Sequence, residues 1–92
     1  MKVIYVSGKY RANTEWGLIE NIAHAEREAI KLWREGWAVI CPHKNTAHLG
    51  GILNGAQNEH DLWMERDLEM VSRCDAIYML SNWQASYGAN LE

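Results

Sequence analysis

Hydrophobic residues occur in short unbroken runs that are separated by longer stretches with helical spacing. The runs cover residues 3–6, 37–41 and 76–80, and Gly8 and Pro42 end the first two. A continuous apolar run of four or five residues is typical of a strand that is buried on both faces, as in a parallel sheet. The sequence therefore predicts three buried strands.

Two stretches between these runs have the spacing of amphipathic helices. The first covers residues 13–36, and Gly36 is a natural C-terminal stop; the second covers residues 59–75. Between the second strand and the second helix, residues 42–58 have no periodicity and predict a long loop. The apolar positions that predict the inner faces are Ile19, Ile22, Ala23, Ile30 and Trp33 in the first helix and Trp63, Met64, Leu68 and Val71 in the second.

The order of strand, helix, strand, helix, strand predicts βαβ crossovers and a parallel sheet in one α/β domain over residues 1–92. Ligands of such sheets bind beyond the carboxyl ends of the strands. In this chain those ends carry the segments SGKYR, PHKN and SNWQASYGANLE.

The composition excludes several classes of partner. The chain has 92 residues, 48% of them hydrophobic and 23% charged, with a net charge of −3. Binding to long nucleic acid needs a basic surface, so we expect none. No apolar run is long enough to cross a membrane, and the N-terminus has no basic-then-apolar leader.

The cysteines and histidines do not predict a metal or a disulfide. Cys41 and Cys74 fit no zinc-binding pattern, and we interpret them as buried thiols of a cytoplasmic protein. The histidines, including His43 in the long loop, have no familiar ligand spacing, so we expect neither a metal nor a cofactor.

Asp67 breaks the pattern of its helix, because it lies one turn after Trp63 and one turn before Val71 on the face that should be apolar. A carboxylate there is either half of a structural ion pair or a group aimed into a cleft with an altered pKa. Similarly, Lys9 and Arg11 directly after Gly8 either hold a phosphate or are surface charges of a solvated loop.

The last residues predict the start of another helix. Ser86 can cap it, and Gly88 keeps the backbone accessible. The partial positive charge of a helix N-terminus would keep Glu92 ionised, as a nucleophilic carboxylate must be. The alternative is that Glu92 only stabilises a first turn.

Three segments in this order, VIYVSGKYR, ERDLEMVSRCDAIYML and SYGANLE, resemble the nucleoside 2-deoxyribosyltransferase superfamily. The resemblance includes its deoxynucleoside monophosphate N-glycosidases and small phage-type relatives of unassigned function. It implies a flavodoxin-like, Rossmann-like fold of three layers, α/β/α, whose parallel sheet is truncated here after the third strand. It also implies cleavage of the bond between a base and its deoxyribose.

The resemblance implies roles for particular residues. Glu92 corresponds to the nucleophile, Asp67 to the acid that places or protonates the departing base, and Tyr5 to the residue that orients the nucleophile. The residues expected to bind substrate, most of them at the phosphate, are Gly8, Lys9, Arg11, Ser86 and Gly88, with His43 and its loop as a candidate for reading the base.

Three functions stay open from the sequence. The first is an enzyme that hydrolyses deoxynucleoside monophosphates or deoxynucleosides, or exchanges their bases. The second is a nucleotide-binding module without turnover, and the third is a structural subunit in which Asp67 pairs with an arginine. The resemblance implies a sheet that continues past the nucleophile, so we expect the chain to be a fragment, a shortened relative or a subunit completed by a partner. A sheet of three strands also has unprotected edges that favour pairing between chains, so we expect a homo-oligomer.

Overall fold

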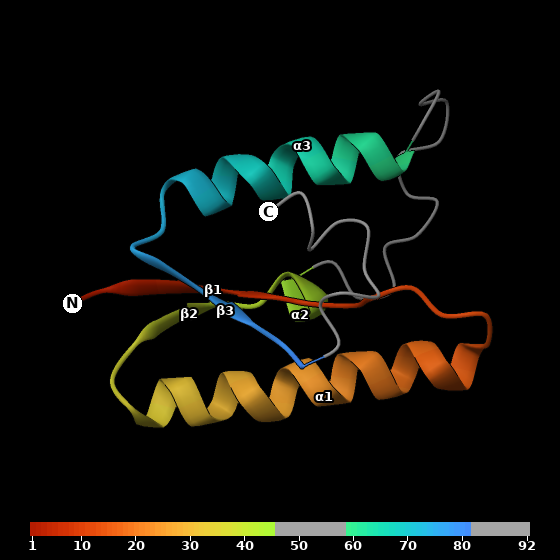
Figure 1. The fold of residues 1–92 in the computed structure, drawn as a ribbon, viewed down its shortest axis with the longest axis horizontal. Helices are drawn as coiled ribbons and strands as arrows, with labels where there is room; N and C mark the ends of the chain where they lie inside the picture. The colour runs from red at the N-terminus through yellow and green to blue at the C-terminus, as the bar shows by residue number, and fades with distance from the viewer. Residues whose placement is uncertain (46–58, 82–92) are drawn as a thin grey trace.

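The computed structural model describes residues 1–45 and 59–81, which form three strands and three helices (Figure 1). The five strands and helices predicted up to residue 80 are confirmed in kind and order, and a short helix is added between the second strand and the last long helix. The helix predicted to start near Ser86 lies outside the described residues. In chain order the elements are β1 Val3–Ser7, α1 Glu15–Arg34, β2 Ala38–Ile40, α2 Pro42–Asn45, α3 Glu59–Ser72 and β3 Ala76–Met79.

The three strands form one parallel sheet in the order β2-β1-β3. Helix α1 covers one face of this sheet and α3 lies over the other, so the protein has three layers (Figure 1). This arrangement confirms the predicted α/β/α fold with a parallel sheet. It also places β1 in the centre, where both of its edges are paired and both of its faces are covered.

The apolar core lies between β1 and α1. Ile4 and Val6 point from β1 into a cluster whose helical members are Ala25, Ala29 and Leu32. Two alanines in this contact keep the helix surface flat, which allows α1 to pack closely on the sheet.

The predicted inner face of α1 is wrong at most of its positions. Ile19, Ile30 and Trp33 are 44%, 40% and 56% exposed, and only Ile22 of the five predicted residues is buried. The face that contacts the sheet is a neighbouring one, formed by Ile22, Ala25, Ala29 and Leu32. The two small alanines at its centre let the helix approach the sheet closely.

The ends of α1 follow standard capping rules. The Thr14 side chain accepts a hydrogen bond of 2.9 Å from the Gly17 backbone N–H, which satisfies one of the free donors of the first turn. Gly36 follows the helix with a φ of +100°, a conformation that glycine adopts without steric cost. The predicted stop at Gly36 is therefore confirmed.

Helix α3 has one half-buried side and one exposed side. The half-buried side contains the predicted residues Trp63, Met64 and Val71, whereas Leu68 is 37% exposed and was wrongly assigned to it. The prediction that the third strand is buried is wrong, because β3 is an edge strand that alternates between half-buried and exposed positions. Ile77 and Met79 are its exposed residues.

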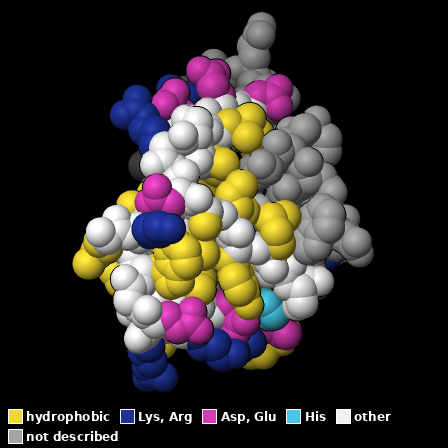
Figure 2. Space-filling view, turned by 60° about the vertical axis from the view of Figure 1, so that its left-hand side comes forward, with side chains coloured by type: hydrophobic (Ala, Val, Ile, Leu, Met, Phe, Trp, Pro, Cys, Tyr) yellow, Lys and Arg dark blue, Asp and Glu magenta, His cyan; other side chains and the backbone are white. Residues whose placement is uncertain are grey.

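Hydrophobic side chains gather across the middle of one face, between charged side chains on α3 above and on α1 below (Figure 2). Within residues 1–45 and 59–81, the outer edges of β2 and β3 pair with no further strand. None of the helices in this part of the chain is both long enough and apolar enough to span a bilayer.

Candidate functional site

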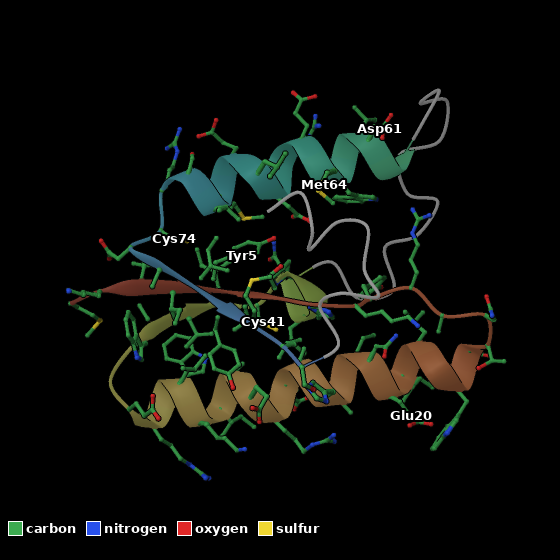
Figure 3. The ribbon with its side chains drawn as sticks, in the orientation of Figure 1. Tyr5, Glu20, Cys41, Asp61, Met64 and Cys74 are labelled. Carbon is green, nitrogen blue, oxygen red and sulfur yellow. The ribbon has the colours of Figure 1, made fainter. Side chains whose placement is uncertain are left out.

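The two faces of β1 differ in chemistry. Alternate residues of a strand point to opposite faces, so Tyr5 and Ser7 face α3 while Ile4 and Val6 face α1. Figure 3 shows the Tyr5 side chain between β1 and α3, with Met64 pointing from α3 toward the sheet. Tyr5 and Ser7 are both almost completely buried. The α3 face of the central strand thus carries two hydroxyl groups in place of aliphatic side chains.

Asp67 lies on the half-buried side of α3, which confirms that it edges onto the inward face of the helix. Its neighbours on that side, one turn away in each direction, are Trp63 and Val71. We call Tyr5, Ser7 and Asp67 the polar layer, since Tyr5 and Ser7 are buried on the α3 face of β1 and Asp67 is half-buried on α3. Each of the three residues takes part in at least one interaction in the folded chain.

Ser7 is not among the site residues predicted from the sequence. Its signal was the alternation along β1, which puts positions 5 and 7 on one face. Ser7 is also the last residue of the strand, paired in register with Met79, so its hydroxyl lies at the carboxyl end of the sheet. This is the end at which ligands of parallel sheets bind.

Gly8 is required by the packing at the end of β1. A β-carbon at this position would lie 2.4 Å from Leu80 Cδ1, 2.6 Å from Leu80 Cβ and 2.8 Å from Leu80 Cγ. Leu80 is itself buried at the end of β3. The glycine therefore lets these two strand ends approach each other, and its role in binding a phosphate stays a prediction.

His43 connects α2 to the loop that follows β1. Its side chain is only 3% exposed, and its Nε2–H donates a hydrogen bond of 2.9 Å to the Lys9 carbonyl. The Tyr10 ring packs edge-on against the imidazole with the ring centres 5.7 Å apart. Pro42–Asn45 is a short helix rather than the start of the predicted loop.

The environment of His43 favours its neutral form. Burial lowers the pKa of the imidazole, while the hydrogen bond to the Lys9 carbonyl opposes that shift. A carbonyl only accepts hydrogen bonds, so the neutral ring carries its proton on Nε2. In the part of the chain that the structure describes, Nδ1 is buried without a hydrogen-bond partner. The role of His43 in recognising the base of a substrate stays a prediction.

The loop between β1 and α1 is also held from the helix side. The Asn21 side-chain amide donates hydrogen bonds of 3.0 Å and 3.3 Å to the carbonyls of Tyr10 and Arg11. These hydrogen bonds fix the loop backbone. The Arg11 side chain is exposed to solvent, whereas Lys9 is half-buried. This geometry is compatible with an anion site at the carboxyl end of β1.

The structure brings some predicted site residues together and leaves others undescribed. Gly8, Lys9 and His43 meet at the carboxyl ends of β1 and β2, and Tyr5 and Asp67 belong to the polar layer. Ser86, Gly88 and Glu92 lie outside the described residues.

The two cysteines are free thiols and both are half-buried. Burial raises the pKa of the Cys41 thiol, which keeps it protonated and unreactive at neutral pH. Among residues 1–45 and 59–81, no three histidine, cysteine, aspartate or glutamate side chains are grouped so that they could hold a metal ion.

Comparisons with known proteins place the chain in one family. Neither a curated protein nor a solved structure matched it. A family model described as a domain of unknown function, DUF4406, matches residues 2–92. The match covers nearly the whole chain, and the protein therefore belongs to the DUF4406 family.

Proposed function

We propose that the protein cleaves the N-glycosidic bond of 2′-deoxynucleoside 5′-monophosphates, or of deoxynucleosides, through a covalent bond between Glu92 and the sugar. Hydrolysis of the monophosphate is the reaction we favour over base exchange. The observation that carries the proposal is the polar layer of Tyr5, Ser7 and Asp67 on the α3 side of β1.

This layer contrasts with the other side of the same strand. The contact between β1 and α1 is made of aliphatic side chains, two of them alanines. They bury the apolar surface that stabilises a small domain. Hydroxyl and carboxyl groups cost free energy to bury and add little to packing. Their concentration on one side of the central strand is typical of a site that handles a polar ligand.

The proposed reaction has two steps. Glu92 attacks the anomeric carbon, the bond to the base breaks, and Asp67 donates a proton to the departing base. A water molecule then attacks the sugar ester, which releases 2-deoxyribose 5-phosphate and restores the Glu92 carboxylate. Deprotonated Asp67 accepts a proton from that water, so the enzyme returns to its starting state.

The loop after β1 is the proposed anchor for the 5′-phosphate. Lys9 and Arg11 would supply positive charge, and Ser86 would donate a hydrogen bond. Anchoring a part of the substrate that does not react fixes the sugar relative to the nucleophile. We therefore expect deoxynucleosides without the phosphate to react more slowly.

The test is an assay for free base with a panel of deoxynucleotides and deoxynucleosides. We expect release from at least one monophosphate and its loss in Glu92→Gln. Glu20→Gln is the matched control, because Glu20 lies on the exposed side of α1 (Figure 3). Saturable nucleotide binding without release of base would instead support a binding module. The absence of both binding and release would rule out both functions.

A further inference from the structure

Helix α1 carries large apolar side chains that the fold leaves uncovered. Trp16 is 68% exposed and Trp33 is 56% exposed, and Ile19 and Ile30 lie between them at 44% and 40%. With half-buried Ala23, they follow the helical repeat along one side of α1. We call Trp16, Ile19, Ala23, Ile30 and Trp33 the α1 stripe.

The order of residues in the α1 stripe reads the same from both ends. Trp16 and Trp33 lie equally far from the midpoint of the pattern, between residues 24 and 25, and so do Ile19 and Ile30. A two-fold interface uses the same surface on both copies and must match itself when it is reversed. Two antiparallel copies of α1 would set tryptophan against tryptophan and isoleucine against isoleucine.

The α1 stripe lies on the side of the protein that carries β2. Glu26, which mirrors Ala23 across the midpoint, forms an ion pair of 3.0 Å with Lys44 on α2, directly after β2. On the other flank of α1, Glu28 accepts a hydrogen bond from Tyr78 on β3. The stripe therefore borders the outer edge of β2, which pairs with no other strand among the described residues.

We infer that the α1 stripe is the interface of a homodimer in which two copies of this chain pack α1 against α1 in antiparallel orientation. The charges of the helix suit this arrangement. The first turn contains Glu15 and the last turn contains Arg34, so opposite charges lie at the same end of the pair. At the centre, Lys44 already offsets the charge of Glu26.

The size of the contact predicts a dimer that depends on concentration. A helix of 20 residues is about 30 Å long. For one stripe of this length with the adjacent β2 edge, we expect a buried area at the lower end of the range for specific interfaces. The two tryptophans are the side chains expected to contribute most of the binding energy.

Sedimentation velocity of the full chain over a range of concentrations tests the interface. We expect a dimer that dissociates on dilution, and a dissociation constant that rises about tenfold or more in Ile30→Glu. Leu68→Glu is the matched control, because Leu68 is an aliphatic residue of α3 that is exposed to a similar degree. It should leave the dimer intact, and circular dichroism should show that both variants are folded.

Cross-linking tests the orientation in a chain with Cys41→Ser and Cys74→Ser. Positions 19 and 30 of one helix are about 16 Å apart, and cysteines there leave both tryptophans in place. Ile19→Cys and Ile30→Cys should therefore form disulfide-linked dimers when they are mixed, but not separately. A wild-type protein that is monomeric at all concentrations, a dimer lost in Leu68→Glu but not in Ile30→Glu, or cross-linking of Ile19→Cys with itself would overturn the inference.

Discussion

At the scale of single residues, Gly8 and Leu80 show how closely the strand ends pack beside the candidate site. The missing side chain at Gly8 leaves room for Leu80, which is buried and cannot move into solvent. We expect Gly8→Ala to lower the free energy of unfolding by about 1–3 kcal/mol, as overpacking does. Urea denaturation measures this loss.

Combining Gly8→Ala with Leu80→Ala should cost less than the sum of the two separate losses, since the smaller side chain relieves the clash. Strictly additive losses would show that the two residues do not compete for space.

His43 predicts how stability depends on pH. Burial lowers its pKa below the usual 6.5, so as the pH falls through that value the unfolded chain gains a proton that the folded chain does not. The free energy of unfolding should therefore fall as the solution is acidified below about pH 6.5. Denaturation curves over this pH range give the profile.

In His43→Gln the side-chain amide can still donate to the Lys9 carbonyl but does not titrate. This variant should show a flatter profile near pH 6. An unchanged slope would mean that another group causes the loss of stability.

The sequence predicted some features of the candidate site and missed others for physical reasons. The position of Asp67 on the inward side of α3 followed from helical spacing alone. The burial of Ser7 and His43 did not, because it depends on how α2 and α3 cover the strand ends. The steric reason for Gly8 is a contact with a residue 72 positions later, which local patterns do not encode.

At the scale of elements, α1 shows why a hydrophobic pattern can predict a helix and still misplace its inner face. The helix has two apolar sides, one made of Ile22, Ala25, Ala29 and Leu32 and the other of the α1 stripe. The larger side chains predicted the wrong side. Their exposure is explained if the α1 stripe is covered by a second copy of the chain.

A hydrogen bond between β3 and α1 tests how the layers are held together. The Tyr78 hydroxyl donates a hydrogen bond of 2.9 Å to the Glu28 carboxylate. The pKa of Glu28 is lowered mainly by its hydrogen bond with Lys31 and next by the one from Tyr78. Tyr78→Phe should reduce the free energy of unfolding by about 0.5–1.5 kcal/mol. Chemical denaturation near pH 7 measures the change.

Lys31→Ala is the comparison variant, because Lys31 is largely exposed where it pairs with Glu28. Such surface pairs contribute less, so its loss should be smaller than that of Tyr78→Phe. The reverse order would show that the bond from β3 does not stabilise the fold.

At the scale of the whole molecule, the order of elements predicted the parallel sheet and its three layers, since connection rules leave few alternatives. Helix α2 was not predicted, because four residues are too short to show periodicity. On one side of the central strand the protein has an apolar cluster, and on the other side the polar layer lies beside the half-buried Trp63, Met64 and Val71. Under the proposed assignment, the first side stabilises the fold and the polar layer carries out the chemistry.

The most direct test of this assignment compares the rate of base release in Asp67→Asn and Asp61→Asn. Both aspartates belong to α3, but Asp67 lies in the polar layer and Asp61 is exposed. We predict that Asp67→Asn lowers kcat by about 10²–10⁴-fold, as expected when a general acid is removed, and that Asp61→Asn stays within about twofold of the wild type. Equal rates in the two variants would contradict the proposal that the polar layer is the catalytic site.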